Sequence, residues 1–379
     1  MILRGAKYLD RHFQVRSGDV KICGEKIFSA GGRIAAEGSE DVTDCSGLTI
    51  VPGFIDIHLH GCGGANICDG TREALETMGR FLIRKGVTSF CPATVVADRE
   101  TLERALLAAK AYMEKPCANA AAMAGVYMEG PFLSRGRIGS MMPDALVLPD
   151  VSLFRHYNGL SGGIVKVVCV APEMPGAYEF IKAVKDECTV SVAHTCAGYD
   201  EAIRAFDCGA SHATHLFNAM TGLHHRNPGV VGAVFDDPRV RAELICDGIH
   251  IHPAVLRAAF SILGERALII SDAMRAAGMP EGKEYEQGGK MVSVKDGKAV
   301  LPDGTLAGSV TDLHTEVRNL VSFGIPFEQA VRAASLIPAR AIGMEAELGS
   351  IEPGKRADLV LLDEEMEIRG VYLRGRRVV

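Results

Sequence analysis

Apolar residues in the middle of the chain gather in short runs, and amphipathic stretches with helical spacing lie between most of them. Eight such runs lie between residues 53 and 346: Phe54–His58, Val87–Cys91, Ala124–Glu129, Val165–Val170, Thr189–His194, Ser211–His215, Ala242–Cys246 and Ala267–Asp272. The clearest helical stretches are Thr71–Lys85, Arg99–Met113, Gly176–Lys185 and Tyr199–Asp207. Strand-like runs that alternate with helices predict βαβ units and a parallel sheet. Eight of them over roughly 290 residues match a (β/α)8 TIM-type barrel.

The two ends of the chain differ from the middle. Residues 1–52 contain short strand-like runs and turns without helical periodicity, and residues 347–379 have the same texture. The second segment opens with several turn residues and continues into the apolar run Ala357–Leu362. We therefore predict an α/β protein in which residues 53–346 form the barrel domain. Residues 1–52 and 347–379 together are expected to form one small, discontinuous β-sandwich domain.

An insertion follows the eighth apolar run. Its apolar segments Lys290–Val294 and Ala299–Leu301 are joined by the turn dipeptide Asp296-Gly297, and a second Asp-Gly pair follows at residues 303–304. This pattern predicts a β-hairpin. Because the insertion comes after a barrel strand, we expect it at the carboxyl-terminal face, where barrels build their active sites.

Composition and charge narrow the possible functions. Hydrophobic residues make up 47% of the chain and charged residues 23%, which is typical of a globular protein with a sizeable core. The net charge of -6 provides no basic field for nucleic acid and no polybasic patch for a membrane surface. No apolar stretch approaches the roughly 20 residues of a membrane-spanning helix. We expect neither a nucleic-acid nor a membrane partner.

The cysteines and the first residues indicate the compartment. The chain has eleven cysteines, an odd number, with no Cys-x-x-Cys pair, and Cys91, Cys169 and Cys246 lie in apolar runs. Small buried thiols are typical of proteins from a reducing compartment. The first residues carry no apolar segment of the kind that a secretory signal requires. A cytoplasmic protein is therefore expected.

Six side chains of the kinds that bind metal ions lie at the ends of five of the apolar runs. They are His58, His60, Glu129, His194, His215 and Asp272. Polar groups at the ends of several strands form the active site of a barrel. Imidazole and carboxylate ligands together with one remaining carboxylate suggest metal-assisted hydrolysis, in which Asp272 serves as general base and acid.

Each of these residues also has a structural interpretation. Side chains alternate along a strand, so His58 and His60 share one face, where they either converge on an ion or are satisfied core histidines. Glu129 is either a ligand or a group that fixes its loop. His194 and His215 are each, taken alone, of a kind that is often structural, and Asp272 is alternatively a further ligand or a helix cap. His212 is interpreted as structural.

Beyond these residues, longer motifs carry a resemblance to a known family. The run Pro52-Gly53-Phe54-Ile55-Asp56-Ile57-His58-Leu59-His60, the later histidines and the final aspartate resemble the amidohydrolase superfamily. More narrowly, the chain is similar to the family of N-acetylglucosamine-6-phosphate deacetylases. The matching motifs include Met128-Glu129-Gly130-Pro131-Phe132, Thr214-His215-Leu216-Phe217-Asn218-Ala219-Met220, Arg226-Asn227-Pro228-Gly229, Asp247-Gly248-Ile249-His250, Ser271-Asp272-Ala273-Met274 and Leu306-Ala307-Gly308-Ser309. The likeness covers essentially the whole chain, in order.

This resemblance implies removal of the acetyl group from a 6-phosphorylated amino sugar. It implies that Glu129, His194 and His215 hold the principal divalent metal, zinc or iron, while His58 and His60 help to bind a second ion with Glu129 as the bridge. Substrate contacts are implied for the remaining motif residues, which are Asn218, Ala219, Arg226, His250, Leu306, Ala307 and Gly308. In the family the arginine reaches the phosphate from a neighbouring subunit, which implies a homodimer.

The chain departs from the family pattern at Met141. The family usually carries a histidine in this stretch, and that histidine donates a hydrogen bond to the substrate carbonyl. Methionine cannot donate one, and loss of one such donor can cost roughly 100- to 1,000-fold in rate. One hypothesis is that the second ion polarises the carbonyl instead; another is that the substrate differs or the activity is weak.

Three functions therefore compete on the sequence. The first is the deacetylase of N-acetylglucosamine 6-phosphate. The second is another amidohydrolase, such as a deacetylase of N-acetylgalactosamine 6-phosphate or a cyclic amide hydrolase. The third, which Met141 alone encourages, is a catalytically weak relative that binds a metabolite. The presence of Asp272 and of all five candidate ligands argues against it.

Overall fold

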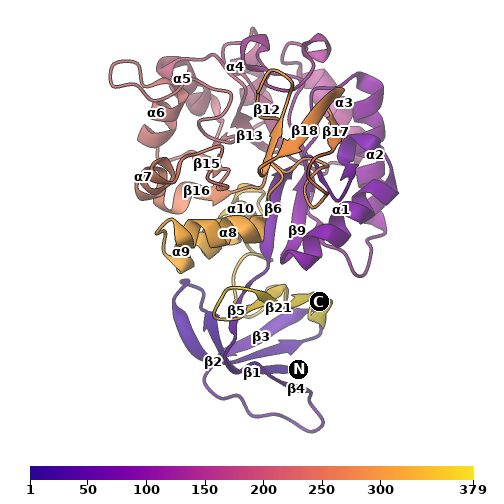
Figure 1. Cartoon of the computed structure of the whole chain (residues 1–379), viewed down its shortest axis with the longest axis vertical. Helices are drawn as coiled ribbons and strands as arrows, with labels where there is room; N and C mark the ends of the chain where they lie inside the picture. Colours follow the sequence, from indigo (N-terminus) through magenta and orange to yellow (C-terminus); the bar gives the residue numbers. More distant parts are fainter.

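A computed structural model describes all residues, 1–379, as a mixed α/β protein (Figure 1). The helices are α1 (Arg72–Arg84), α2 (Arg99–Glu114), α3 (Val151–Ser161), α4 (Ala177–Val184), α5 (Tyr199–Cys208), α6 (Gly229–Asp236), α7 (Pro253–Leu263), α8 (Leu313–Ser322), α9 (Phe327–Ala333) and α10 (Leu336–Ala341). Short 3-10 turns are η1 (Ile67–Asp69), η2 (Arg135–Arg137), η3 (Pro143–Ala145) and η4 (Gly264–Arg266). No helix is both long and apolar enough to cross a bilayer.

Parallel strands carry the middle of the chain. One sheet has the order β10-β9-β6, and a second has the order β11-β12-β13-β14-β15-β16. Their bounds are β6 (Phe54–Leu59), β9 (Val87–Pro92), β10 (Ala122–Met123), β11 (Val126–Met128), β12 (Val165–Val170), β13 (Thr189–Val192), β14 (His212–Ala213), β15 (Arg241–Leu244) and β16 (Ala267–Ile269). Every one of the eight predicted apolar runs overlaps one of these strands, and all of their pairings are parallel.

Backbone contacts join the two parallel sheets on both sides. A parallel bridge pairs Ala93, just after β9, with Tyr127 in β11. On the other side, the N–H of Asp272 donates to the carbonyl of His58 at 3.0 Å, which connects the end of β16 to β6. The parallel sheet is therefore curled, and the carboxyl ends of its strands lie along one rim.

The four predicted helices are confirmed with small shifts at their ends. In α1, Thr71 caps the first turn by accepting from the N–H of Ala74, as N-cap threonines do. The residues that α1 buries include Leu75, Met78 and Leu82, which are spaced three and four apart and so share one face of the helix. The same spacing recurs in the other helices and turns their apolar faces toward the strands.

Strands from both ends of the chain form a separate sheet, at the bottom of Figure 1. Its members are β1 (Ile2–Leu9), β2 (Val15–Cys23), β3 (Lys26–Gly31), β4 (Val42–Asp44), β5 (Thr49–Pro52), β20 (Leu359–Leu362), β21 (Ile368–Leu373) and β22 (Arg376–Arg377). They hydrogen bond in the order β22-β21-β20-β5-β1-β2-β3, with β4 beside β1. The N- and C-terminal segments thus pair with each other through β5 and β20.

The insertion after β16 is an antiparallel three-stranded sheet. It consists of β17 (Glu284–Gln287), β18 (Lys290–Lys295) and β19 (Lys298–Val300). The predicted hairpin corresponds to β18 and β19, with Asp296 and Gly297 both at positive φ in its turn. The strand β17 was not predicted. A further two-stranded ribbon, β7 (Gly61–Cys62) and β8 (Ala65–Asn66), follows β6.

The cysteines lie both in the core and at the surface. All eleven are free thiols, and Cys91, Cys169 and Cys246 are fully buried.

Shortening Leu359 to alanine should weaken the sheet that joins the two ends. Leu359 is fully buried in a cluster with Leu3, Ile50 and Tyr372. A Leu→Ala change in such a core costs about 2–5 kcal/mol. Urea unfolding should show a lower midpoint for Leu359→Ala, whereas Val15→Ala, at a residue of the same sheet that is 42% exposed, should stay close to the parent protein. Equal midpoints for the two variants would contradict this role of the cluster.

Candidate metal centre and active site

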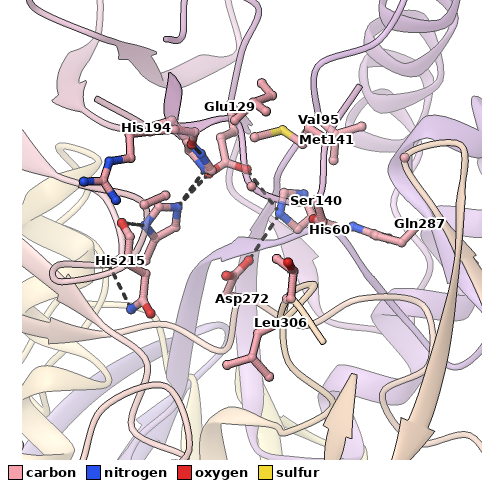
Figure 2. A pocket seen from close by; sticks show the side chains of 18 of the residues that line it. His60, Val95, Glu129, Ser140, Met141, His194, His215, Asp272, Gln287 and Leu306 are labelled. Atoms are coloured by element: carbon pink, nitrogen blue, oxygen red, sulfur yellow. Dashed lines mark hydrogen bonds and ion pairs between the residues drawn. The ribbon is translucent and has the colours of Figure 1, made fainter. Parts of the chain in front are cut away.

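The six predicted site residues lie together along the rim where the parallel strands end, and Figure 2 shows all of them except His58. His58 belongs to β6 and His60 follows it, Glu129 directly follows β11, and the others lie two or three residues beyond β13, β14 and β16. All six are buried, with relative exposures between 0% and 8%. Residues far apart in the sequence therefore meet in one place, as predicted.

Glu129 is the centre of the first group. Its Oε1 lies 3.1 Å from His194 Nε2 and 3.0 Å from His215 Nε2, and these two ring nitrogens are themselves 3.1 Å apart. The three ligand atoms are close enough to share one ion. This is the set that the family resemblance assigns to the principal metal.

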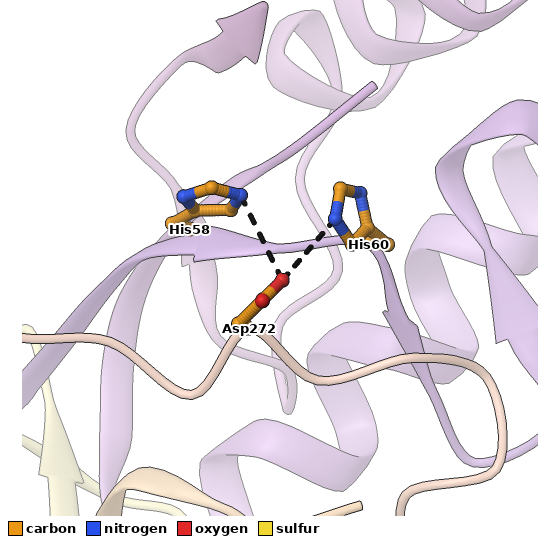
Figure 3. Close-up of side chains that lie close together, drawn as sticks. All are labelled: His58, His60 and Asp272. Atoms are coloured by element: carbon orange, nitrogen blue, oxygen red, sulfur yellow. Dashed lines mark ion pairs between the residues drawn. The ribbon is translucent and has the colours of Figure 1, made fainter. Parts of the chain in front are cut away.

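A second group lies beside the first (Figure 3). His60 Nε2 is 3.2 Å from Asp272 Oδ1, and His58 Nε2 is 3.8 Å from the same oxygen. His60 Nε2 also lies 3.2 Å from Oε2 of Glu129. The carboxylate of Glu129 thus faces both groups. Its Oε1 lies nearest His194 and His215 and also 3.7 Å from His58 Nε2, and its Oε2 lies nearest His60.

Backbone carbonyls hold the Nδ1 atoms of three of the four histidines. His60 Nδ1 bonds the carbonyl of Ala93 at 3.0 Å, His194 Nδ1 bonds the carbonyl of Arg137 at 2.7 Å, and His215 Nδ1 lies 3.2 Å from the carbonyl of Asn218. A carbonyl oxygen only accepts, so these Nδ1 atoms carry the protons. Nε2 is then the ring nitrogen that faces the cluster, which is how metal-binding histidines are oriented.

Partner-free polar atoms show that a cation fits this cluster. His58 Nε2 is buried without a hydrogen-bond partner, and the polar contacts of the buried Asp272 Oδ1 are with the imidazoles of His60 and His58, at 3.2 and 3.8 Å. His194 and His215 point their Nε2 atoms at each other, an arrangement that needs a proton or a cation between them. Imidazole nitrogens and carboxylate oxygens are ligands that Zn²⁺ and related divalent ions accept. We conclude that the cluster is a site for a divalent metal.

Electrostatics in the cluster favour positive charge. Burial alone raises the pKa of Glu129, but His58 and His194 outweigh it and hold that pKa well below the usual value. Burial lowers the pKa of His60, but hydrogen bonds with Asp272 and Glu129 prevail and raise it to about 9. The carboxylates are therefore ionised and attract either protons or a metal ion.

Glu243 is a functional residue that the sequence analysis missed. It is fully buried in β15, and its carboxylate accepts from His58 Nδ1 at 2.9 Å, His212 Nε2 at 2.9 Å and the backbone N–H of His215 at 3.2 Å. Burial raises its pKa, but His58 and His212 prevail and lower it strongly. The carboxylate orients His58. Its signal was present in the sequence as the single acid inside the apolar run Ala242–Cys246.

His212 agrees with its interpretation as a structural residue. Its ring is fully buried, and it reaches the metal-binding groups only through Glu243.

The backbone turns sharply at three of the six residues. His194, His215 and Asp272 have φ values of 42°, 31° and 46°, in the left-handed region that residues with a Cβ rarely adopt. Such conformations cost of order 1–3 kcal/mol and concentrate at functional sites. Here they occur where the chain leaves a strand and places the side chain in the cluster.

A cavity of about 450 Å³ opens above the cluster. Its lining includes five of the six cluster residues and most of the predicted substrate contacts, namely Asn218, Ala219, His250, Leu306 and Gly308. His250 is oriented by Asp247, whose carboxylate lies 2.7 Å from its Nδ1. The segment of Leu306 and Gly308 runs beside the end of β16, because the N–H of Ser309 donates to the carbonyl of Asp272.

Two predicted contacts do not line the cavity. Ala307 is fully buried beneath its neighbours. Arg226 lies in an exposed loop and does not reach the cavity within the one chain.

Met141 lines the cavity, but its thioether is directed into the wall. The N–H of Val96 lies 3.3 Å from Met141 Sδ, and the side chain belongs to an apolar cluster that includes Val95 and Leu133. The residue is only 4% exposed. The Met141 side chain therefore fills space and provides no hydrogen-bond donor to the cavity.

Known proteins resemble this chain over most of its length. A family model described as the amidohydrolase family matches residues 49–378. The N-acetylgalactosamine-6-phosphate deacetylase of Escherichia coli O157:H7 is 36% identical, over 88% of this chain and 89% of that protein. The N-acetylglucosamine-6-phosphate deacetylase of Bacillus subtilis is also 36% identical, over 89% of this chain and 86% of that protein. A mutant N-acetyl-D-glucosamine-6-phosphate deacetylase from Mycobacterium smegmatis, solved in complex with N-acetyl-D-glucosamine-6-phosphate, superposes with a TM-score of 0.93 at 33% identity, covering 100% of this chain and 99% of the other.

Replacement of His215 by asparagine should strip the first group of its metal. The change removes one of three converging ligands. Loss of a group that only hydrogen bonds to a ligand already lowers metal affinity by about 10- to 100-fold, so we expect the affinity of this variant to fall by at least about 100-fold. Elemental analysis after dialysis against a weak chelator measures the retained metal. His225→Asn changes an exposed histidine ten residues later and should keep the full content. Equal metal in both variants would refute the assignment.

Metal uptake should strengthen as pH rises. The pKa of His60, about 9, means that its ring is protonated at neutral pH in protein stripped with a chelator, so an incoming ion must displace that proton. Affinity should therefore increase by about tenfold per pH unit for each proton displaced, up to about pH 9. Competition with a chromophoric chelator at pH 6.5, 7.5 and 8.5 gives the slope. A slope of zero would show that no imidazole proton is released.

Proposed function

This chain belongs to the amidohydrolase family, and from that premise we propose that it hydrolyses the acetamide of N-acetylglucosamine 6-phosphate to glucosamine 6-phosphate and acetate. The observation that carries the proposal is the convergence of four imidazoles, Glu129 and Asp272 in one cluster, of which all residues but His58 line the cavity. Relatives with this activity match over most of the chain.

The metal is held by the residues already described. Glu129, His194 and His215 would hold the principal ion, zinc or iron, and His58 and His60 a second one, with Glu129 shared between them. When bound, the metal supplies Lewis acidity, which lowers the pKa of water and polarises a carbonyl group. Imidazole and carboxylate groups bind several divalent ions, and the order of affinity among these ions follows the Irving–Williams series.

Asp272 moves the proton. Burial raises its pKa, but His60 and His58 prevail and lower it, so the carboxylate is ionised and ready to accept a proton at neutral pH. It takes the proton of the water that attacks the acetyl carbon. It then returns that proton to the amine nitrogen as the C–N bond breaks, because an amine leaves poorly without one. The carbonyl of His58 accepts from the backbone N–H of Asp272 and helps fix its position.

The sugar phosphate would occupy the rest of the cavity. Asn218 and the backbone at Ala219 lie on one wall, and His250 and the segment Leu306–Gly308 provide further contacts for the phosphate and the sugar hydroxyls. Arg226 is exposed on its loop, which suits a residue that reaches the phosphate of a neighbouring subunit in a homodimer. We propose that the protein acts in the cytoplasm, as an enzyme of amino-sugar catabolism.

We also infer how the domains are divided. Residues 53–346 would form a closed (β/α)8 barrel, an inference supported by the contacts that join the two parallel sheets on both sides. Residues 1–52 and 347–379 would form a small discontinuous β domain, supported by their shared sheet and its separate apolar cluster. Whether a second layer completes a β-sandwich stays a prediction.

A second substrate is favoured by one specific observation. The Escherichia coli relative acts on the galactose epimer, as its name states, and matches this chain as well as the Bacillus subtilis relative does. The epimers differ only at the sugar 4-hydroxyl, which is remote from the acetamide. The same six residues would therefore serve both.

Acetate release from the two epimers should separate these substrates and test Asp272. The protein, loaded with Zn²⁺ or Fe²⁺, should release acetate from N-acetylglucosamine 6-phosphate with a higher kcat/KM than from the galactose epimer. Asp272→Asn removes the proton carrier and should lower kcat by roughly 100- to 10,000-fold. Asp303→Asn, in an exposed turn, is the matched control and should be unaffected. No acetate from either sugar would refute the proposed function.

A further inference from the structure

One wall of the cavity is formed by the insertion after β16 and contains an amide that no motif had marked. Gln287 is the last residue of β17 and is only 4% exposed. Its side chain lines the same cavity as His60, Met141 and Asp272. Figure 2 shows it extending from the insertion toward His60.

Hydrogen bonds fix which end of this amide faces the cavity. The backbone N–H of Cys68 donates to Asn66 at 2.8 Å, and because a backbone N–H only donates, the Asn66 atom that it meets must be the oxygen. The other Asn66 atom is therefore the NH2 group, and it donates to Gln287 at 3.1 Å. The Gln287 atom at that contact must be Oε1. Its Nε2 is therefore the atom that faces the cavity. The two hydrogen bonds of Asn66 fix this orientation of the Gln287 amide.

The Nε2 group has no acceptor within the protein. The only side-chain hydrogen bond of Gln287 is the one from Asn66 to its oxygen. The side chain lines the open cavity, so this donor is available to an acceptor atom of a bound ligand. The complementary ligand atom is a hydrogen-bond acceptor, such as a carbonyl oxygen.

The same wall contains Met141, where the family resemblance leads one to expect a donor. Lys290, in β18, donates from Nζ to the carbonyl of Met141 at 3.2 Å. Gly289 lies close against Met142, because a Cβ at that glycine would come within 2.8 Å of the Met142 sulfur. The turn that follows Gln287 is therefore fastened to the loop that carries Met141. A donor from the insertion reaches the cavity beside the residue that cannot provide one.

We propose that Gln287 Nε2 donates a hydrogen bond to the acetyl carbonyl oxygen of the substrate and stabilises the negative charge that develops there. This role rests on the proposed deacetylase function. As the water oxygen bonds to the acetyl carbon, its proton passes to Asp272 and the carbonyl oxygen becomes an alkoxide. When the C–N bond breaks, the electron pair of the alkoxide re-forms the C=O bond, and Asp272 returns its proton to the amine nitrogen. A carbonyl oxygen suits a pure donor, whereas a sugar hydroxyl could pair with either end of an amide.

Gln287→Met tests the donor with little change in side-chain length. We expect kcat to fall by roughly 100- to 1,000-fold, as for other lost oxyanion donors, while KM changes by less than about threefold. The metal content, measured in the same preparations, should not change. Glu284→Gln, at an exposed position of the same strand, is the matched control and should retain the parent kinetics.

Two measurements ask whether the lost contact is to the carbonyl. An N-trifluoroacetyl substrate has a more electrophilic carbonyl, so the defect of Gln287→Met should shrink by about tenfold or more. Met141→His restores a donor on the same wall, so the double variant should recover at least about tenfold in kcat over Gln287→Met. A general structural defect would affect both substrates equally and would not be rescued.

Asn66→Asp tests the positioning of the amide. Aspartate keeps the oxygen for Cys68 but replaces the NH2 group with a second acceptor. Gln287 should then rotate its NH2 toward residue 66 and present oxygen to the cavity. We expect kcat to fall at least as far as in Gln287→Met, with KM nearly unchanged and with rescue by Met141→His.

The outcomes separate this inference from the proposed function. If the parent protein deacetylates the sugar phosphate and Gln287→Met stays within threefold of it, the role of Gln287 is refuted and the function stands. An equal loss with the acetyl and trifluoroacetyl substrates would refute the carbonyl contact in the same way. If the parent releases no acetate from either epimer, the proposed function is refuted and this inference with it.

Discussion

The shared carboxylate of Glu129 is the interaction on which the site depends. A buried carboxylate is costly unless it is paired, and this one faces four imidazoles that come from three different strand ends. The fold meets this requirement by ending parallel strands at one rim, so that each contributes one or two side chains. A divalent ion that compensates this charge would therefore both stabilise the arrangement and supply its chemistry.

Groups behind the ligands matter as much as the ligands. Three of the histidines are fixed by backbone carbonyls, and His58 is fixed by the carboxylate of Glu243. Glu243 also holds His212 and the backbone N–H of His215, so one buried charge ties β6, β14 and β15 together behind the metal site. Hydrogen bonds of this kind set the tautomer and the direction of each ring before any ion binds.

Sequence patterns predicted what depends on local order along the chain. The eight apolar runs became parallel strands, and His58, His60, Glu129, His194, His215 and Asp272 met because each stands where a strand ends. The pattern could not reveal Glu243 as a partner of His58, because that contact depends on which strands curl around to face each other. It also could not place Gln287, because β17 is short, half-exposed and without clear alternation. The proposed role of Gln287 depends on a contact with Asn66, which lies in the separate ribbon of β7 and β8. The position of Arg226 relative to the phosphate could not be predicted from apolar patterns either, because the proposed contact would need a second chain.

The pairing of β5 with β20 has a consequence for biosynthesis. Thr49 lies opposite Leu362, and β5 leads almost directly into β6, the strand that bears His58. While the chain is being made, the first strands have emerged from the ribosome long before their neighbour β20 exists. The edge of β5 that pairs with β20 therefore stays unpaired for most of translation. Unpaired strand edges are prone to associate with other chains. Completion of the terminal sheet is thus a late event that closes the fold, and a nascent chain interrupted before residue 359 would be a natural client for chaperones or proteases.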